Sequence, residues 1–269
     1  MGISYRYSTA HKFVGEIVAV GGQWLRNLSD KEIRELFRDN IVLLNANAVE
    51  TLFSLGLQDC ICATQAQRMK TDDITYSYER VENGKKYLNI PAAMASCYAD
   101  SPDAMFINYK EDCKISTWTA FYDPYRRRVG KAFVTVEDRV LIFPYYGYHR
   151  KVGTLHTLRD EVLKDALNQC VRKDKMPLYV NEPCVSVYDY ILPKGKAVVL
   201  VNFSDDDIDS PISVFGSWTE EVRNIVRLDR KTGKRKPVRF KKVTSHINIY
   251  MKLLREETAV LLVNSGEEL

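Results

Sequence analysis

Residues 16–63 alternate short apolar runs with amphipathic segments, and this alternation restricts the fold more than any other feature of the chain. The runs at 16–20 and 41–44 predict buried strands, and the run at 57–63 predicts a third. The segments between them have the 3–4 spacing of a helix face. Strand–helix–strand–helix–strand is the pattern of a parallel sheet, although this stretch is too short for a whole doubly wound domain.

End signals support both of these helices. Ser29 and Glu32 form an S-x-x-E capping box in front of the first helix. Asn45 or Asn47 can cap the second helix, and Gly56 is placed to end it. The pair Gly21-Gly22 after the first strand lacks the third glycine and the Lys-Ser/Thr of a phosphate-binding loop.

From about residue 71 the chain changes to alternating strand patterns separated by turn signals. One strong helix interrupts them at 157–171, with an apolar face opposite a charged face. The last ninety or so residues contain seven candidate strands at roughly ten-residue spacing, which is typical of a β-sandwich. Residues 229–234 (DRKTGK) are expected to form a hairpin turn.

The charge is unevenly distributed. The chain has 39 basic and 35 acidic residues, a net charge of +4, yet residues 223–242 alone carry ten Lys or Arg and one Asp. That segment could contact phosphate backbones, so nucleic-acid binding is one hypothesis. An exposed hairpin whose lysines protect an edge strand is the alternative, and we expect nucleic acid not to be the partner.

The six cysteines are scattered, and only Cys60 and Cys62 are close, so the sequence predicts buried thiols rather than a disulfide framework. The first twenty residues contain no signal peptide, and no apolar run is long enough to span a membrane. A cytoplasmic protein without a membrane partner is therefore expected. A chain from which an upstream segment had been removed would give the same pattern.

No complete catalytic constellation is apparent. Cys60 and Cys62 lack the glycines of a nucleophile elbow, the four histidines are isolated from one another, and the acidic run at 205–209 lacks the glycine and terminal Glu of an EF-hand loop. No βα unit repeats eight times, so no sugar-cleaving barrel is predicted. We therefore predict no catalytic residues, no metal and no cofactor.

A group of aromatic residues is the best candidate for a binding site. Aromatic rings stack on sugars and give a large contact area at a small entropic cost. The alternative is that these rings pack in the core and across strands. The candidate carbohydrate-binding residues are Trp118, Tyr122, Tyr125, Tyr145, Tyr146 and Tyr148.

Residues 16–63 also resemble a segment of large glycoside hydrolases of the β-galactosidase type, in which a barrel is followed by a glutamine-amidotransferase-like (flavodoxin-like) trimerisation domain. The matching positions are the helix start at 28–33, the strand at 42–45 and the helix at 47–57. The tail from 196 onwards is similar to the small β-sandwich that ends such enzymes. The resemblance carries over no catalytic residue, because that domain generally lacks its nucleophile and the barrel is absent.

Together these observations predict a β-rich α+β chain with two domains. Residues 1–176 would hold a partial flavodoxin-like α/β segment with a β-rich extension, and 177–269 an immunoglobulin-like β-sandwich. The leading hypothesis is a non-catalytic accessory or oligomerisation module that supports carbohydrate binding. Its partners would be a carbohydrate, a second copy or a missing catalytic domain. A stand-alone carbohydrate-active enzyme that uses the aromatic cluster is the alternative.

Overall fold

A computed structural model describes eight stretches of the chain, and these are β-rich. They fall into two compact units that divide after Val171. Within the described stretches no helix combines the length and the apolar character needed to cross a bilayer. The stretches are residues 13–69, 76–84, 91–94, 104–146, 157–172, 175–182, 184–244 and 246–264.

The first unit contains a five-stranded mixed sheet in the order β1-β2-β11-β10-β7. The strands β1 (Ile17–Val20), β2 (Ile41–Leu44) and β11 (Val140–Ile142) are parallel. The strands β10 (Val134–Val136) and β7 (Ile115–Thr117) complete the sheet in antiparallel pairing. The parallel pairing of the first two strands agrees with the sequence pattern, whereas the flavodoxin-like assignment stays a prediction.

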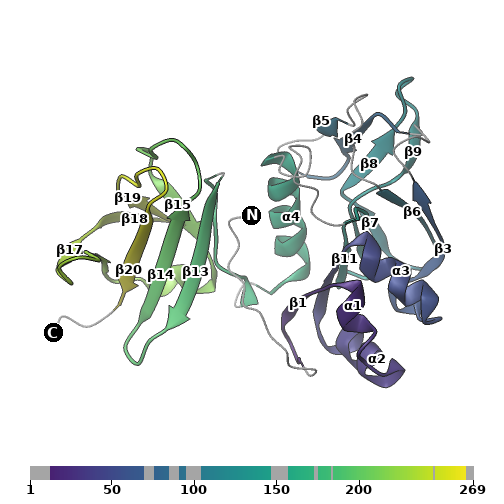
Figure 1. Ribbon diagram of the computed structural model, residues 1–269, viewed down its shortest axis with the longest axis horizontal. Helices are drawn as coiled ribbons and strands as arrows, with labels where there is room; N and C mark the ends of the chain where they lie inside the picture. The colour runs from purple at the N-terminus through teal and green to yellow at the C-terminus, as the bar shows by residue number, and fades with distance from the viewer. Residues whose placement is uncertain are drawn as a thin grey trace. The chain divides into compact units, whose positions relative to one another are not determined.

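Three helices pack on one side of this sheet (Figure 1). They are α1 (Gly22–Leu25), α2 (Asp30–Asp39) and α3 (Ala46–Ser54). The predicted capping box is present at the start of α2: the Ser29 side chain accepts from the Glu32 N–H, and Glu32 Oε2 accepts from the Ser29 N–H at 2.7 Å. The apolar faces of the three helices and the inward side chains of the sheet form one core.

The residues at both ends of α3 also agree with the sequence prediction. Asn45 is the N-cap, and its side chain accepts from the Ala48 N–H at 3.0 Å. Gly56 follows the helix with a φ of +73°, a left-handed conformation that glycine adopts without a steric penalty.

The prediction of a third strand at residues 57–63 is wrong. Residues Gln58–Ile61 form a 3₁₀ helix, η1, and place Leu57 and Ile61 together in the core. The strand begins later, as β3 (Ala63–Met69), and pairs antiparallel with β6 (Ala104–Tyr109) rather than joining the parallel sheet. A short apolar run fits a helical turn as well as a strand. Leu57 and Ile61 are buried while Asp59 between them is exposed, which the two-residue period of a strand would not produce.

A four-stranded antiparallel sheet lies in the same unit, in the order β5-β4-β8-β9. Its strands are β5 (Pro91–Met94), β4 (Tyr78–Val81), β8 (Thr119–Tyr122) and β9 (Arg128–Lys131). All four residues of β8 are buried, because this central strand is covered on both faces.

The helix α4 (Thr157–Cys170) confirms the helix predicted at 157–171. Val134 and Val136 of β10 point into the core beneath α1–α3, whereas the intervening Thr135 hydrogen-bonds Cys170 at the end of α4. Because side chains alternate along a strand, α4 lies against the opposite face of the sheet. The apolar spacing of this helix places Lys164 on its charged face, yet Lys164 is only 6% exposed.

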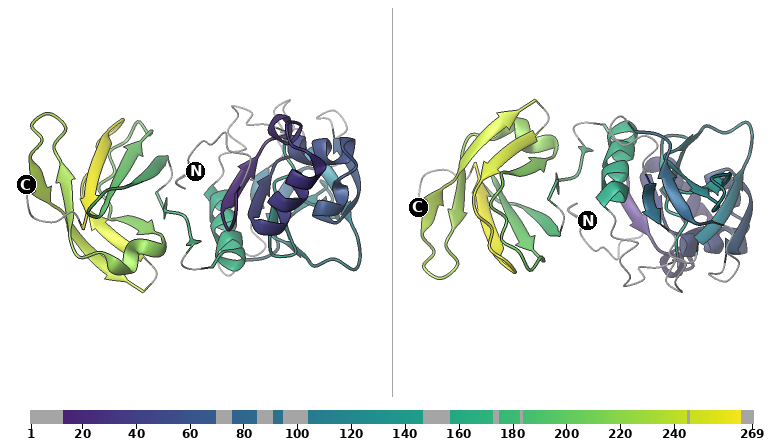
Figure 2. Two further views of the ribbon diagram at one scale, coloured as in Figure 1. Left: turned by 90° about the horizontal axis from the view of Figure 1, so that it is seen from below. Right: turned by 90° about the horizontal axis from the view of Figure 1, so that it is seen from above.

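The second unit is a β-sandwich, as predicted from strand number and spacing, and Figure 2 shows its two layers. Inward side chains of both layers form one core. Its immunoglobulin-like character stays a prediction. One layer contains β12 (Tyr179–Val180), β15 (Ile212–Phe215), β19 (His246–Tyr250) and β18 (Arg239–Val243). The other contains β13 (Val185–Ile191), β14 (Lys196–Asn202), β20 (Thr258–Val263), β16 (Ile225–Leu228) and β17 (Arg235–Pro237).

The prediction that the cysteines are all thiols is also wrong, because Cys62 and Cys113 form a disulfide with a Cα–Cα distance of 6.3 Å. Burial raises the pKa of the Cys60 thiol and raises that of Cys170 to about 11. Neither is the low-pKa thiol that nucleophilic catalysis requires. Disulfides persist mainly in oxidising compartments, so the cytoplasmic localisation stays a prediction.

Candidate functional site

The structure does not bring the predicted aromatic residues together on one surface. Trp118, Tyr122, Tyr145 and Tyr146 are between 3% and 7% exposed, whereas Tyr125 is 78% exposed. Tyr148 lies outside the described residues. Among those described, only Tyr125 therefore presents an open ring face to solvent, and a shared carbohydrate platform stays a prediction.

The buried aromatic residues have structural partners. The Trp118 indole N–H donates to Thr135 Oγ1 at 2.7 Å. Tyr145 packs edge-on against Phe121 with ring centroids 6.0 Å apart, and Tyr146 belongs to the core beneath α1–α3. These contacts fit the packing alternative for these three residues.

The sequence did not reveal a buried carboxyl group in the first unit. Glu79 is 1% exposed and lies on the inward face of β4. Thr119 donates to its Oε1 and Tyr145 to its Oε2, while Thr119 Oγ1 accepts from the Phe133 N–H at 2.9 Å. Glu79 thus links residues from β4, β8 and the segment after β11, and no local motif marks such a set of partners.

Glu79→Gln is expected to reduce the free energy of unfolding by about 2 kcal/mol. The amide places an N–H₂ donor where the carboxyl group has an acceptor, so one buried hydroxyl loses the acceptor for its proton. Urea denaturation measures the change. Glu50→Gln on the exposed side of α3 is the control and should shift stability by less than about 0.5 kcal/mol. Equal effects of the two substitutions would contradict the role of Glu79.

The opposite face of β4 carries a strip of charged and aromatic side chains. Tyr122 lies between the stacked ring of Tyr78, 5.4 Å away, and the guanidinium of Arg80, 3.9 Å from its centroid. Arg80 donates to the Tyr122 hydroxyl, which donates to Glu82. Arg128 of β9 continues the strip with an ion pair to Glu82 at 2.8 Å. Burial, and after it the carboxylate of Glu82, raise the pKa of Tyr122.

The β8–β9 turn follows Tyr122 in the sequence and carries the exposed ring of Tyr125. Asp123 Oδ1 accepts from the Arg127 N–H at 2.8 Å, and Oδ2 accepts from its Nε at 2.7 Å. Burial opposes ionisation of Asp123, but these bonds and the charge of Arg127 hold its pKa below the ordinary value. The Arg127 guanidinium lies 5.2 Å from the ring centroid of Tyr125. We call Arg80, Glu82, Tyr125, Arg127 and Arg128 the hairpin surface.

The hairpin surface combines the groups that a neutral polar ligand needs. The exposed ring of Tyr125 can stack on an apolar face, and guanidinium groups offer several fixed donors. Glu82 supplies an acceptor and is 20% exposed at its side chain. Because Asp123 and Glu82 are both paired with arginine, and Glu79 is enclosed, these three acids form no free pair across a cleft.

Both charged segments of the second unit form ion pairs within that unit. The basic segment 223–242 includes the β16–β17 hairpin, where the Asp229 N–H donates to Lys234 O at 2.8 Å, as predicted for 229–234. Arg227 forms an ion pair with Glu257. In the acidic run, Asp207 pairs with Lys252 at 2.8 Å, which lowers its pKa. Nucleic-acid binding stays a prediction.

No protein-family profile matches the chain, and no curated protein matches its sequence. Several solved structures are similar in part. The β-galactosidase from Bacillus circulans sp. alkalophilus has a TM-score of 0.45 at 10% identity, over 92% of this chain and 32% of that one. Gan42B, a β-galactosidase from G. stearothermophilus, gives 0.43 at 12%, over 90% and 30%. A rhamnosidase from Novosphingobium gives 0.36 at 11%, over 90% and 16%. The chain spans less than a third of the length of each of these proteins.

Proposed function

We propose that this chain is a non-catalytic module that binds a carbohydrate through the hairpin surface. The observation that carries the proposal is the position of Tyr125, whose ring is 78% exposed at the tip of a turn fixed by Asp123 and Arg127. A rigid exposed ring flanked by charged hydrogen-bonding groups suits a sugar, which has an apolar C–H face and a rim of hydroxyls. The sequence resemblance to the region after the barrel of glycoside hydrolases supports the same class of ligand.

Tyr125→Ala is expected to weaken binding about tenfold, because about 1.4 kcal/mol of stacking free energy is lost. The measurement is affinity gel electrophoresis on a panel of neutral β-linked polysaccharides: galactan, xylan and mannan. Tyr190→Ala is the matched control, because Tyr190 is also an exposed tyrosine, at 57%, but lies in the second unit. Equal retardation of both variants, or no retardation of the wild type by any polysaccharide, would remove the proposal.

The rival hypothesis of a stand-alone enzyme makes a different prediction. Turnover of a nitrophenyl glycoside that Glu82→Gln abolishes would favour catalysis, since Glu82 is the one partly exposed carboxylate of the hairpin surface. Association with a second copy or with a catalytic domain is a further part of the proposal. Light scattering of the purified chain tests self-association.

A further inference from the structure

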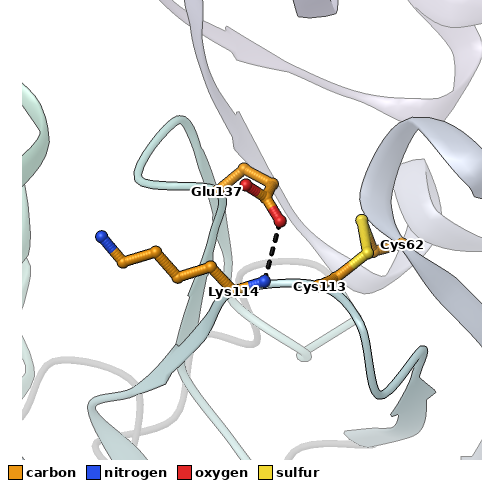
Figure 3. Close-up of a disulfide and its surroundings, with 4 residues drawn as sticks. All are labelled: Cys62, Cys113, Lys114 and Glu137. Carbon is orange, nitrogen blue, oxygen red and sulfur yellow. Dashed lines mark hydrogen bonds between the residues drawn. A yellow bond between two sulfur atoms is a disulfide. The ribbon is translucent and has the colours of Figure 1, made fainter.

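We propose that Cys62, Cys113 and Glu137 form a metal site that becomes available when the disulfide is reduced and that takes a zinc-class divalent cation. Three segments far apart in the sequence bring these residues together: the end of η1, the segment before β7 and the β10–β11 turn. One ligand atom from each residue lies within 4.8 Å of the others. Figure 3 shows the carboxylate beside the two sulfurs.

The ligand types suit this class of cation. Zinc takes thiolate sulfur at about 2.3 Å and carboxylate oxygen at about 2.0–2.2 Å. Two sulfurs on one tetrahedral ion are then ~3.8 Å apart. The Cα–Cα distance of 6.3 Å between Cys62 and Cys113 lets the sulfurs separate that far by side-chain rotation. Three protein ligands leave a fourth position for water.

The carboxylate is held in place by the backbone. The Lys114 N–H donates to Glu137 Oε1 at 2.7 Å, and the Glu137 N–H donates to Lys114 O at 2.9 Å. This hydrogen bond orients Glu137. The oxygen that accepts it lies on the side of the sulfurs in Figure 3 and keeps a second lone pair that can bind an ion. The Lys114 ammonium forms an ion pair with Asp138. The nearby positive charge is therefore partly compensated.

The disulfide controls access to the site, because its sulfurs are bonded to each other and carry no thiolate charge. Reduction by a phosphine puts two electrons into the S–S bond. The phosphine takes the oxygen of one water to become its oxide, and the two protons of that water convert the sulfurs to thiols. Each thiol loses its proton to the buffer when its sulfur binds the cation.

The test uses Co²⁺ as the probe, added to the full chain under anaerobic conditions before and after phosphine treatment. The reduced chain is expected to develop a thiolate-to-cobalt charge-transfer band that saturates at one ion per chain and that Zn²⁺ abolishes. The oxidised chain should show no band. A reduced chain without a band, or with a band that the double variant Cys62→Ser/Cys113→Ser retains, overturns the proposal.

Two further variants distinguish this site from other thiols. Glu137→Gln should weaken binding on the order of 10–100-fold, while in the oxidised chain its amide oxygen still accepts from Lys114 and the melting temperature is unchanged. Cys60→Ser, at a free half-buried thiol, should bind as the wild type does. If reduction unfolds the chain, one equivalent of Zn²⁺ must restore its circular dichroism spectrum. Failure to do so, or equal binding by Glu137→Gln, also overturns the proposal.

Discussion

Replacing both Cys62 and Cys113 by alanine is expected to lower the free energy of unfolding by about 4 kcal/mol under oxidising, metal-free conditions. The disulfide joins residues 51 positions apart, so it removes many conformations from the unfolded chain. In the folded chain it ties the 3₁₀ turn after α3 to the segment that leads into β7. The effect should appear in the first unit, which contains both cysteines.

Urea denaturation followed by circular dichroism measures this loss. Reducing agent should lower the midpoint of the wild type to that of the double variant and should leave the variant unchanged. Cys184→Ala is the control, because Cys184 is an exposed free thiol in the second unit and its loss should cost less than about 0.5 kcal/mol. A wild-type midpoint that is insensitive to reductant would show that the disulfide adds no stability.

The disulfide illustrates what sequence reasoning could not find. Cys62 and Cys113 are separated by segments whose path is set by tertiary packing, and residue spacing carries no information about that path. The 3₁₀ turn before Cys62 was missed for a related reason, since the short apolar run at 57–63 fits two periods. By contrast, the capping signals of α2 and α3 are local, so these helices were predicted with their ends.

The candidate site was also predictable only in part. The sequence shows that aromatic residues are frequent around β8, but it could not distinguish a ring exposed to solvent from a buried one. Tyr122 and Tyr125 are three residues apart, yet one lies in a central strand covered by Arg80 and the other at the tip of a turn. The Asp123-Pro124 turn signal was the available sign of exposure for Tyr125. Nothing local marks the partners of Glu79, which come from other strands.

The second substitution with a large expected effect on stability is at the adjacent glycines Gly21 and Gly22, where α1 begins. Gly22→Ala is expected to cost about 3 kcal/mol, at the upper end of the range for overpacking a core. A Cβ atom there would lie 2.5 Å from Thr51 Oγ1 and 2.6 Å from the backbone oxygen of Asn47. The Thr51 hydroxyl donates to that same oxygen at 3.0 Å, so neither atom can move away without disturbing α3.

Gly21→Ala is the matched control in the same urea experiment. A Cβ atom on Gly21 would meet no atom within 4 Å, and the φ of −102° is accessible to any residue. Its substitution should change stability by less than about 0.5 kcal/mol. Equal effects at the two positions would mean that α1 and α3 do not approach as closely as Gly22 permits. A large loss of stability at Gly22 alone would show that Gly22 is needed for the close packing of α1 against α3. That packing explains the glycine at position 22 without a phosphate-binding role.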